Sequence, residues 1–144
     1  METDKYLVGK LIGETDQFRI YQCKLSDGGV GILKIAVSPA QNGLLDREAF
    51  ILKTLREEAE KCEEEYRERN PGKVLNYAIQ FTNLVDSFIS PEQGDRRINV
   101  MNFVNVSDDI GQLVPIEQVI TRDRVRVDPR TSAWIMGKIL KLLS

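Results

Sequence analysis

Two oppositely charged residues in apolar surroundings, Lys34 and Glu48, constrain the fold of this chain most. Lys34 lies near the end of the apolar run 30–35, a pattern typical of a β-strand. Glu48 lies in a predicted helix over 44–69, in which apolar residues recur at steps of three and four. A charge left unpaired beside a buried face is costly, so each residue needs a partner. We therefore predict that Lys34 and Glu48 form an ion pair between strand and helix.

The predicted helix has one apolar face. The residues that define this face are Leu45, Ala49, Leu52, Leu55, Ala59, Cys62 and Tyr66. Glu48 follows Leu45 by three positions and precedes Leu52 by four, which places it at the edge of this face. Beyond Leu55 the helix continues as a highly charged extension until the breaker Asn70-Pro71-Gly72. The extension is either a solvated lengthening of the helix or a docking surface for a regulatory partner.

Strand patterns precede the helix. The predicted strands cover residues 6–12, 18–25 and 30–35. The turn Asp27-Gly28-Gly29 leads into the strand of Lys34, and residues 90–95 form a second turn.

The order of these elements resembles the amino-terminal lobe of protein kinases, over roughly the whole chain. In that family a Val-Ala-Ile-Lys-like strand carries a lysine, and a Glu on the following helix pairs with it. Gly31-Ile32-Leu33-Lys34 takes the place of that strand here. The segment 46–55 is similar to the family's helix, with Arg-Glu followed by an Ile-Leu-Lys-x-Leu run. Residues 81–89 and 97–104 resemble the family's fourth and fifth strands. The resemblance implies the lobe of a serine/threonine kinase-like protein, an α+β fold in which one long helix packs on a twisted antiparallel sheet of about five strands.

The resemblance also implies ATP with Mg²⁺ as the cofactor of the longer parent, with weak or absent binding by the fragment alone, and assigns roles to individual residues. Lys34 would hold the α- and β-phosphates, and Glu48 would orient Lys34; these are the two implied catalytic residues. Gly13 and Thr15 fall in the implied phosphate loop, and Met101 would guard the back of the pocket. The residues implied to line the adenine slot are Ile12, Ile20, Ile32, Met101 and Phe103, with hinge main-chain groups over Asn102, Phe103 and Val104.

The end of the chain resembles the start of a second kinase lobe. Asp128-Pro129 is a good helix start and introduces a helix that is apolar on nearly every side up to 143. We expect residues 1–104 to form the kinase-like lobe, and 105–144 to form the hinge and the first helices of an incomplete second lobe. The family's catalytic-loop and metal-binding Asp motifs do not occur, and the chain has no histidine. The expectation is that only a longer parent transfers the γ-phosphate of ATP to protein hydroxyls, and that the fragment alone is inactive.

The phosphate loop departs from the family's Gly-x-Gly-x-x-Gly pattern. Only Gly13 is retained, while Thr15 and Phe18 occupy the other two glycine positions. Ile32 stands where the family usually has a small Ala, and this larger side chain could crowd the purine. Two interpretations follow. The chain belongs to an atypical active kinase, or it is a pseudokinase or scaffold module that binds protein partners without phosphotransfer.

Composition and charge argue against several classes of protein. The formal charge of −2 argues against a general nucleic-acid binder. No stretch is long enough for a membrane span, and residues 1–5 are not a signal peptide, so we expect a cytoplasmic protein with reduced cysteines. The expected partners are ATP and a protein substrate or regulatory partner, with no membrane, no nucleic acid and no bound metal at the named residues.

Four arginines cluster before the last helix. They are Arg122, Arg124, Arg126 and Arg130. Their alternation with valines suggests a short exposed strand or hairpin. The cluster is either a solvated linker or a surface that engages a phosphopeptide or an acidic partner.

Overall fold

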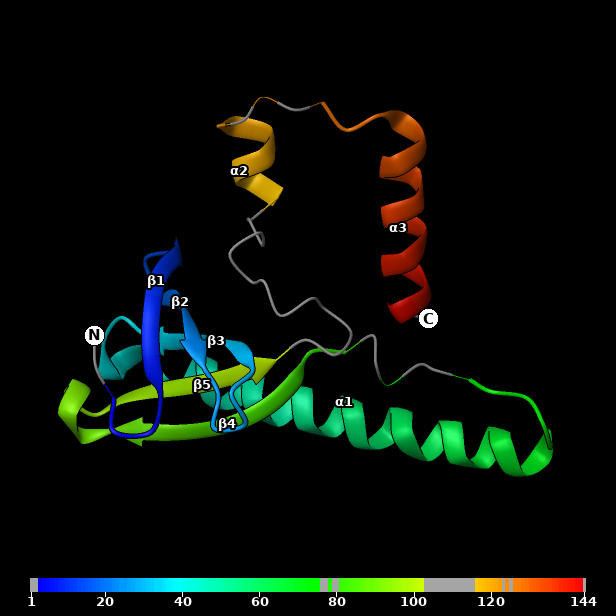
Figure 1. Cartoon of the computed structure of the whole chain (residues 1–144), viewed down its shortest axis with the longest axis horizontal. Coiled ribbons are helices and arrows are strands. Elements are labelled where there is room, and N and C mark those ends of the chain that lie inside the picture. Colours follow the sequence, from blue (N-terminus) through cyan, green and yellow to red (C-terminus); the bar gives the residue numbers. More distant parts are fainter. Residues whose placement is uncertain are drawn as a thin grey trace. The chain divides into compact units, whose positions relative to one another are not determined.

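The computed structural model describes residues 3–75, 78, 81–102, 116–122, 124 and 126–143. The chain divides into two compact units, Met1–Ile110 and Gly111–Ser144, each of which is described by itself. The first unit contains an antiparallel sheet and a long helix (Figure 1). This α+β architecture confirms the predicted fold class at the level of its layers.

The sheet of the first unit has five strands. They are β1 (Leu7–Glu14), β2 (Phe18–Lys24), β3 (Val30–Ala36), β4 (Asn83–Ser90) and β5 (Arg96–Asn102), in the spatial order β1-β2-β3-β5-β4. Every neighbouring pair is antiparallel. The predicted strand 97–104 is observed up to Asn102, and Phe103 and Val104 lie outside the described residues.

Two glycines allow the backbone to adopt the β2–β3 turn and the close contact between β3 and β5. Gly28 has a φ of 85°, which favours glycine, in the turn that Asp27 closes by accepting a hydrogen bond from the Gly29 N–H at 2.8 Å. At Gly31 a Cβ atom would lie only 2.7 Å from the Met101 carbonyl oxygen. The missing side chain at Gly31 therefore lets β3 approach β5 closely.

The hydrophobic core lies on one face of the sheet. Its largest fully buried apolar side chains are Leu33, Ile35, Ile98 and Val100, and Cys23 and Leu25 join them. Tyr6, just before β1, stacks on Phe88 of β4 with ring centroids 6.2 Å apart, and its hydroxyl donates to Asp86 Oδ2 at 3.1 Å. Because β1 and β4 are the two edge strands, these contacts curl the sheet around its core. Burial raises the pKa of Tyr6 to about 12, and the Asp86 carboxylate contributes to this rise.

The long helix α1 (Asn42–Arg69) follows a single 3₁₀ turn, η1 (Pro39–Gln41), and packs on β4 and β5. Leu45 and Ala49 are buried, as predicted. The prediction was wrong for Leu55, which is 43% exposed, and for Cys62, which is also exposed. Leu52, Ala59 and Tyr66 are half-buried on the predicted face, and Arg56 and Glu63 take the inner positions predicted for Leu55 and Cys62.

Polar partners explain this shift of the inner face. Arg56 Nε donates to Glu60 Oε1 at 3.0 Å, and Glu63 Oε1 accepts the Ala78 N–H at 2.6 Å. Two charged residues can therefore occupy inner positions that the hydrophobic pattern assigned to Leu55 and Cys62. The charged extension is thus tied at Glu63 to the segment that returns to the sheet.

The second unit contains α2 (Ile116–Thr121) and α3 (Pro129–Leu143). The predicted start of α3 is confirmed, because Asp128 Oδ1 accepts the N–H groups of Arg130 at 2.9 Å and Thr131 at 3.1 Å. Hydrogen bonds from Thr131 lower the pKa of Asp128. The predicted strand or hairpin in the arginine cluster is not formed in its described part (122, 124 and 126–128), where Arg124 has a φ of 52° that interrupts an extended chain. None of the helices described here has both the length and the apolar character needed to cross a membrane.

The two cysteines provide a test of the core. Cys23 is 2% exposed and its pKa is raised to about 11 by burial, whereas Cys62 is exposed. We predict that an aromatic disulfide reagent modifies Cys62 rapidly in the native chain and Cys23 roughly a hundredfold or more slowly, because Cys23 must first be uncovered. Modification is followed by absorbance in the wild-type chain and in Cys62→Ser. Equal modification rates for both thiols would contradict the buried position of Cys23 in the core.

Candidate functional site

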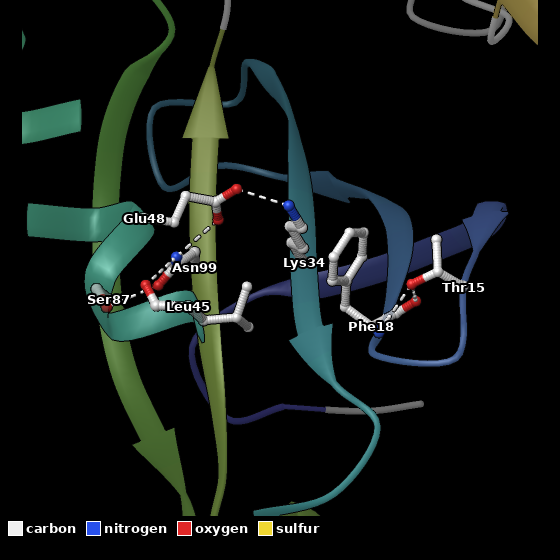
Figure 2. Close-up of polar contacts among 7 residues, drawn as sticks. All are labelled: Thr15, Phe18, Lys34, Leu45, Glu48, Ser87 and Asn99. Carbon is white, nitrogen blue, oxygen red and sulfur yellow. Dashed lines mark hydrogen bonds and ion pairs between the residues drawn. The ribbon is translucent and has the colours of Figure 1, made fainter. Parts of the chain in front are cut away.

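The predicted ion pair between Lys34 and Glu48 is present. Lys34 Nζ lies 2.6 Å from Glu48 Oε1 (Figure 2). The side chains are 14% and 28% exposed, so the pair is only partly accessible to water. At this distance the contact is a charge-assisted hydrogen bond that joins β3 to α1.

The alternation of β3 directs Lys34 toward α1. Leu33 and Ile35, its neighbours in sequence, are 0% and 1% exposed in the core on the opposite face. Leu45 and Ala49 are buried on either side of Glu48 and hold this part of α1 against the sheet. The apolar patterns of strand and helix therefore fix where the two charges meet.

Asn99 of β5 belongs to the candidate site and was not predicted from the sequence. It lies directly opposite Lys34 in the ladder and is 0% exposed. Its Nδ2 atom donates to the Leu45 carbonyl oxygen at 2.8 Å and to Glu48 Oε2 at 3.0 Å. Both carboxylate oxygens of Glu48 are thus held, one by Lys34 and the other by Asn99 (Figure 2).

A polar chain extends from Asn99 across the sheet. Ser87 of β4 donates through its hydroxyl to Asn99 Oδ1 at 2.7 Å, and Arg97 Nη1 donates to Ser87 Oγ at 3.0 Å. Arg97 Nη2 also lies 3.3 Å from Asp46 Oδ1, and the backbone N–H of Arg97 donates to Asn42 Oδ1 at 2.7 Å. These contacts fix the first turns of α1 on the sheet. A sequence signal existed, since an Asn between Ile98 and Val100 is unusual in a buried strand.

Phe18 contacts Lys34 from the side away from Glu48 (Figure 2). Lys34 Nζ lies 3.8 Å from the centroid of the Phe18 ring, well within the range of a cation–π interaction. Phe18 is the first residue of β2 and pairs with Ala36 of β3. The sequence analysis noted Phe18 as a missing glycine but did not predict this contact.

The structure places the other predicted pocket residues in two neighbouring rows of the sheet. Ile20 lies directly opposite Lys34, and Ile32 lies opposite Met101. Directly opposed residues of an antiparallel pair share a face, so these apolar side chains lie on the face of Lys34. Met101 is 8% exposed.

The remaining predicted pocket residues lie at the margins of these rows. Gly13 is opposite Ile20, and Ile12 falls at an irregularity of β1 between Leu11 and Gly13. The Asn102 side chain accepts a hydrogen bond from Asn83 at 2.7 Å. The predicted hinge contacts of Phe103 and Val104 cannot be placed, because both residues lie outside the described part of the chain.

Neither a metal cluster nor a known relative identifies the site. In the part of the chain that the structure describes, no group of three or more Cys, Asp or Glu side chains could hold a metal ion. Comparison of the sequence and structure with protein-family models, curated proteins and solved structures finds no match. The function must therefore be inferred from the geometry around Lys34.

The Asn99→Asp substitution tests the polar chain. A carboxylate in place of the amide would face Glu48 and the Leu45 carbonyl, replacing two donated hydrogen bonds by repulsion. We predict a loss of about 2–4 kcal/mol in the free energy of unfolding at pH 7. The loss should shrink as the pH is lowered, because protonation of the introduced carboxyl removes the repulsion.

The matched control is Asn83→Asp, measured by the same urea titrations. Asn83 is half-buried on β4 and donates to the Asn102 side chain, outside the Glu48 network. Its replacement should cost about 1 kcal/mol or less. Equal losses in the two variants would show that Asn99 has no special role in holding Glu48.

Proposed function

We propose that the first unit is the nucleotide-binding lobe of a protein kinase-like protein, in which Lys34 binds the phosphates of ATP. The observation that carries this proposal is the Lys34–Glu48 pair, at 2.6 Å and mostly shielded from water. The resemblance to the kinase lobe requires such a lysine on a strand and such a carboxylate on the following helix. The ion pair between Lys34 on β3 and Glu48 on α1 supports these two roles.

The site has the chemical properties of an anion-binding site. An ammonium group has three N–H donors, and Glu48 is the acceptor of one of them. Glu48 is itself fixed by Asn99, so the cation is held in place before a ligand arrives. Ile20, Ile32 and Met101 supply an apolar surface on the same face, which suits a flat adenine ring.

The described residues fit the nucleotide better than they fit the metal. Lys34 can contact phosphate oxygens and Glu48 can orient Lys34, but no carboxylate cluster suitable for Mg²⁺ is found among the described residues. Bound ATP–Mg²⁺ would supply a transferable γ-phosphate. We propose that its transfer to serine or threonine hydroxyls takes place only in a longer protein that carries this lobe.

A second candidate function is a pseudokinase or scaffold module that binds protein partners without phosphotransfer. The observation that favours it is the Phe18 ring, which lies 3.8 Å from the Lys34 ammonium, in the place of a glycine of the family. Ile32, in the place of a small Ala, favours the same candidate. In this case the Lys34–Glu48 pair would hold α1 on the sheet and would bind no phosphate.

The Lys34→Met substitution tests the proposed function. We predict that ATP binding to the 144-residue chain weakens about 10- to 100-fold, because a charge-assisted hydrogen bond to phosphate is lost, while adenosine binding changes about twofold or less. Both affinities are measured by isothermal titration calorimetry, and circular dichroism verifies the fold. Lys53→Met is the control, because Lys53 lies on α1 with its side chain 71% exposed. Failure of the wild-type chain to bind either ligand would contradict the proposed function.

Autophosphorylation of a longer protein carrying this lobe separates the two candidates. An active kinase incorporates label from ATP with Mg²⁺, and Lys34→Ala abolishes the incorporation. A scaffold module incorporates no label in either form although the fold persists. The Lys53→Ala version controls for the loss of a lysine elsewhere on the lobe.

A further inference from the structure

The turn between β1 and β2 is closed by its own hydrogen bonds. The Thr15 N–H donates to the Phe18 carbonyl oxygen at 2.9 Å. The Thr15 hydroxyl oxygen accepts the N–H groups of Gln17 at 3.2 Å and Phe18 at 3.1 Å. Three backbone N–H groups that could bind an anion are therefore already bonded within the turn.

A surface ion pair flanks the same turn. Arg19 Nε lies 2.6 Å from Glu14 Oε1, so the residues on either side of the turn are joined. The Glu14 contact raises the pKa of Arg19. Arg19 offsets the charge of Glu14, and Asp16 leaves the turn with a net negative charge, which disfavours the approach of a polyphosphate. The turn is thus closed and acidic, the opposite of a backbone cradle for phosphates.

Phe18 connects this closed turn to Lys34. The Thr15 hydroxyl holds the Phe18 N–H, and the Phe18 ring lies against the Lys34 ammonium (Figure 2). Glu48 contacts the ammonium from α1. A phosphate oxygen that approaches Lys34 from the side of the turn must therefore displace the ring and lose the cation–π interaction.

We propose that Phe18, positioned by Thr15, determines ligand selectivity by screening Lys34 from polyphosphate. The site would then discriminate between ATP and adenosine less strongly than an uncovered lysine would allow. This selectivity rests on the proposed function, because it presupposes a nucleotide beside Lys34. It adds to that function the residue that sets how much the phosphates contribute to affinity.

Phe18→Leu provides the principal test. Leucine keeps an apolar side chain but has no aromatic face for the ammonium. We predict that the ratio of ATP to adenosine affinity, measured by calorimetry on the 144-residue chain, rises about threefold to tenfold. Inorganic tripolyphosphate, which needs no adenine slot, should gain affinity by a similar factor. Thr15→Val, which removes the hydroxyl acceptor, should change both quantities in the same direction by a smaller factor.

Phe88→Leu is the matched control. Its ring also contacts a lysine, with Lys5 Nζ 4.6 Å from the centroid, but the pair lies at the edge strand β4. This substitution removes a cation–π contact of the same kind away from Lys34. The affinity ratio and the tripolyphosphate affinity should remain within about twofold of wild type.

Proton NMR tests the contact without any ligand. The ε-methylene protons of Lys34 should be shifted upfield by the Phe18 ring, and Phe18→Leu should abolish the shift while Phe88→Leu preserves it. Absence of the shift in the wild-type chain would overturn the proposal. A measured shift with unchanged ATP-to-adenosine and tripolyphosphate values in Phe18→Leu would also overturn it, while leaving nucleotide binding intact. If no variant bound ATP or adenosine, the proposed function would fail, and tripolyphosphate affinity alone would decide whether Phe18 screens Lys34.

Discussion

The ion pair between Lys34 and Glu48 is the interaction around which the sheet and the long helix are organised. β3 cannot place a cation on the face that α1 covers without an acceptor, and α1 cannot pack against the sheet with an unpaired carboxylate. The ion pair satisfies both charges, with 2.6 Å between Lys34 Nζ and Glu48 Oε1, and Asn99 donates a hydrogen bond to the second oxygen of Glu48. The position of α1 and the environment of Lys34 are therefore set by one polar network between helix and sheet.

The Lys34 ammonium can interact with more than one group, and the proposed functions depend on which group it contacts. Glu48 and Phe18 contact the ammonium in the structure, and we propose that nucleotide phosphate is the third partner. In the proposed function Glu48 orients the cation toward a ligand, and in the proposed selectivity Phe18 competes with that ligand. The two proposed functions, an active kinase lobe and a scaffold module, therefore differ in which partner prevails, although both retain the same ion pair.

Hydrophobic periodicity was sufficient to predict the first three strands, the long helix and the pairing of Lys34 with Glu48, because strand alternation and helix period fix which faces the charges occupy. It was insufficient for Leu55 and Cys62, because the inner face of α1 passes through the next residue in each case, Arg56 and Glu63. Both of these side chains have polar partners that allow them to lie inward. Asn99 and Phe18 were missed as partners because their contacts depend on how side chains of separate elements meet: Asn99 reaches Glu48 from β5, and Phe18 reaches Lys34 from the neighbouring strand β2. No local pattern encodes such contacts, apart from the unexpected polar residue in an apolar strand.

The most direct test of a phosphate site at Lys34 is labelling with an acyl phosphate of ATP, which transfers its acyl group to a lysine nitrogen beside the phosphates and releases ATP. Mass spectrometry then identifies the modified lysine. The account predicts that Lys34 is acylated, although its side chain is only 14% exposed, and that excess ATP suppresses the reaction. Acylation of exposed lysines such as Lys53, with Lys34 unmodified and no effect of ATP, would contradict it.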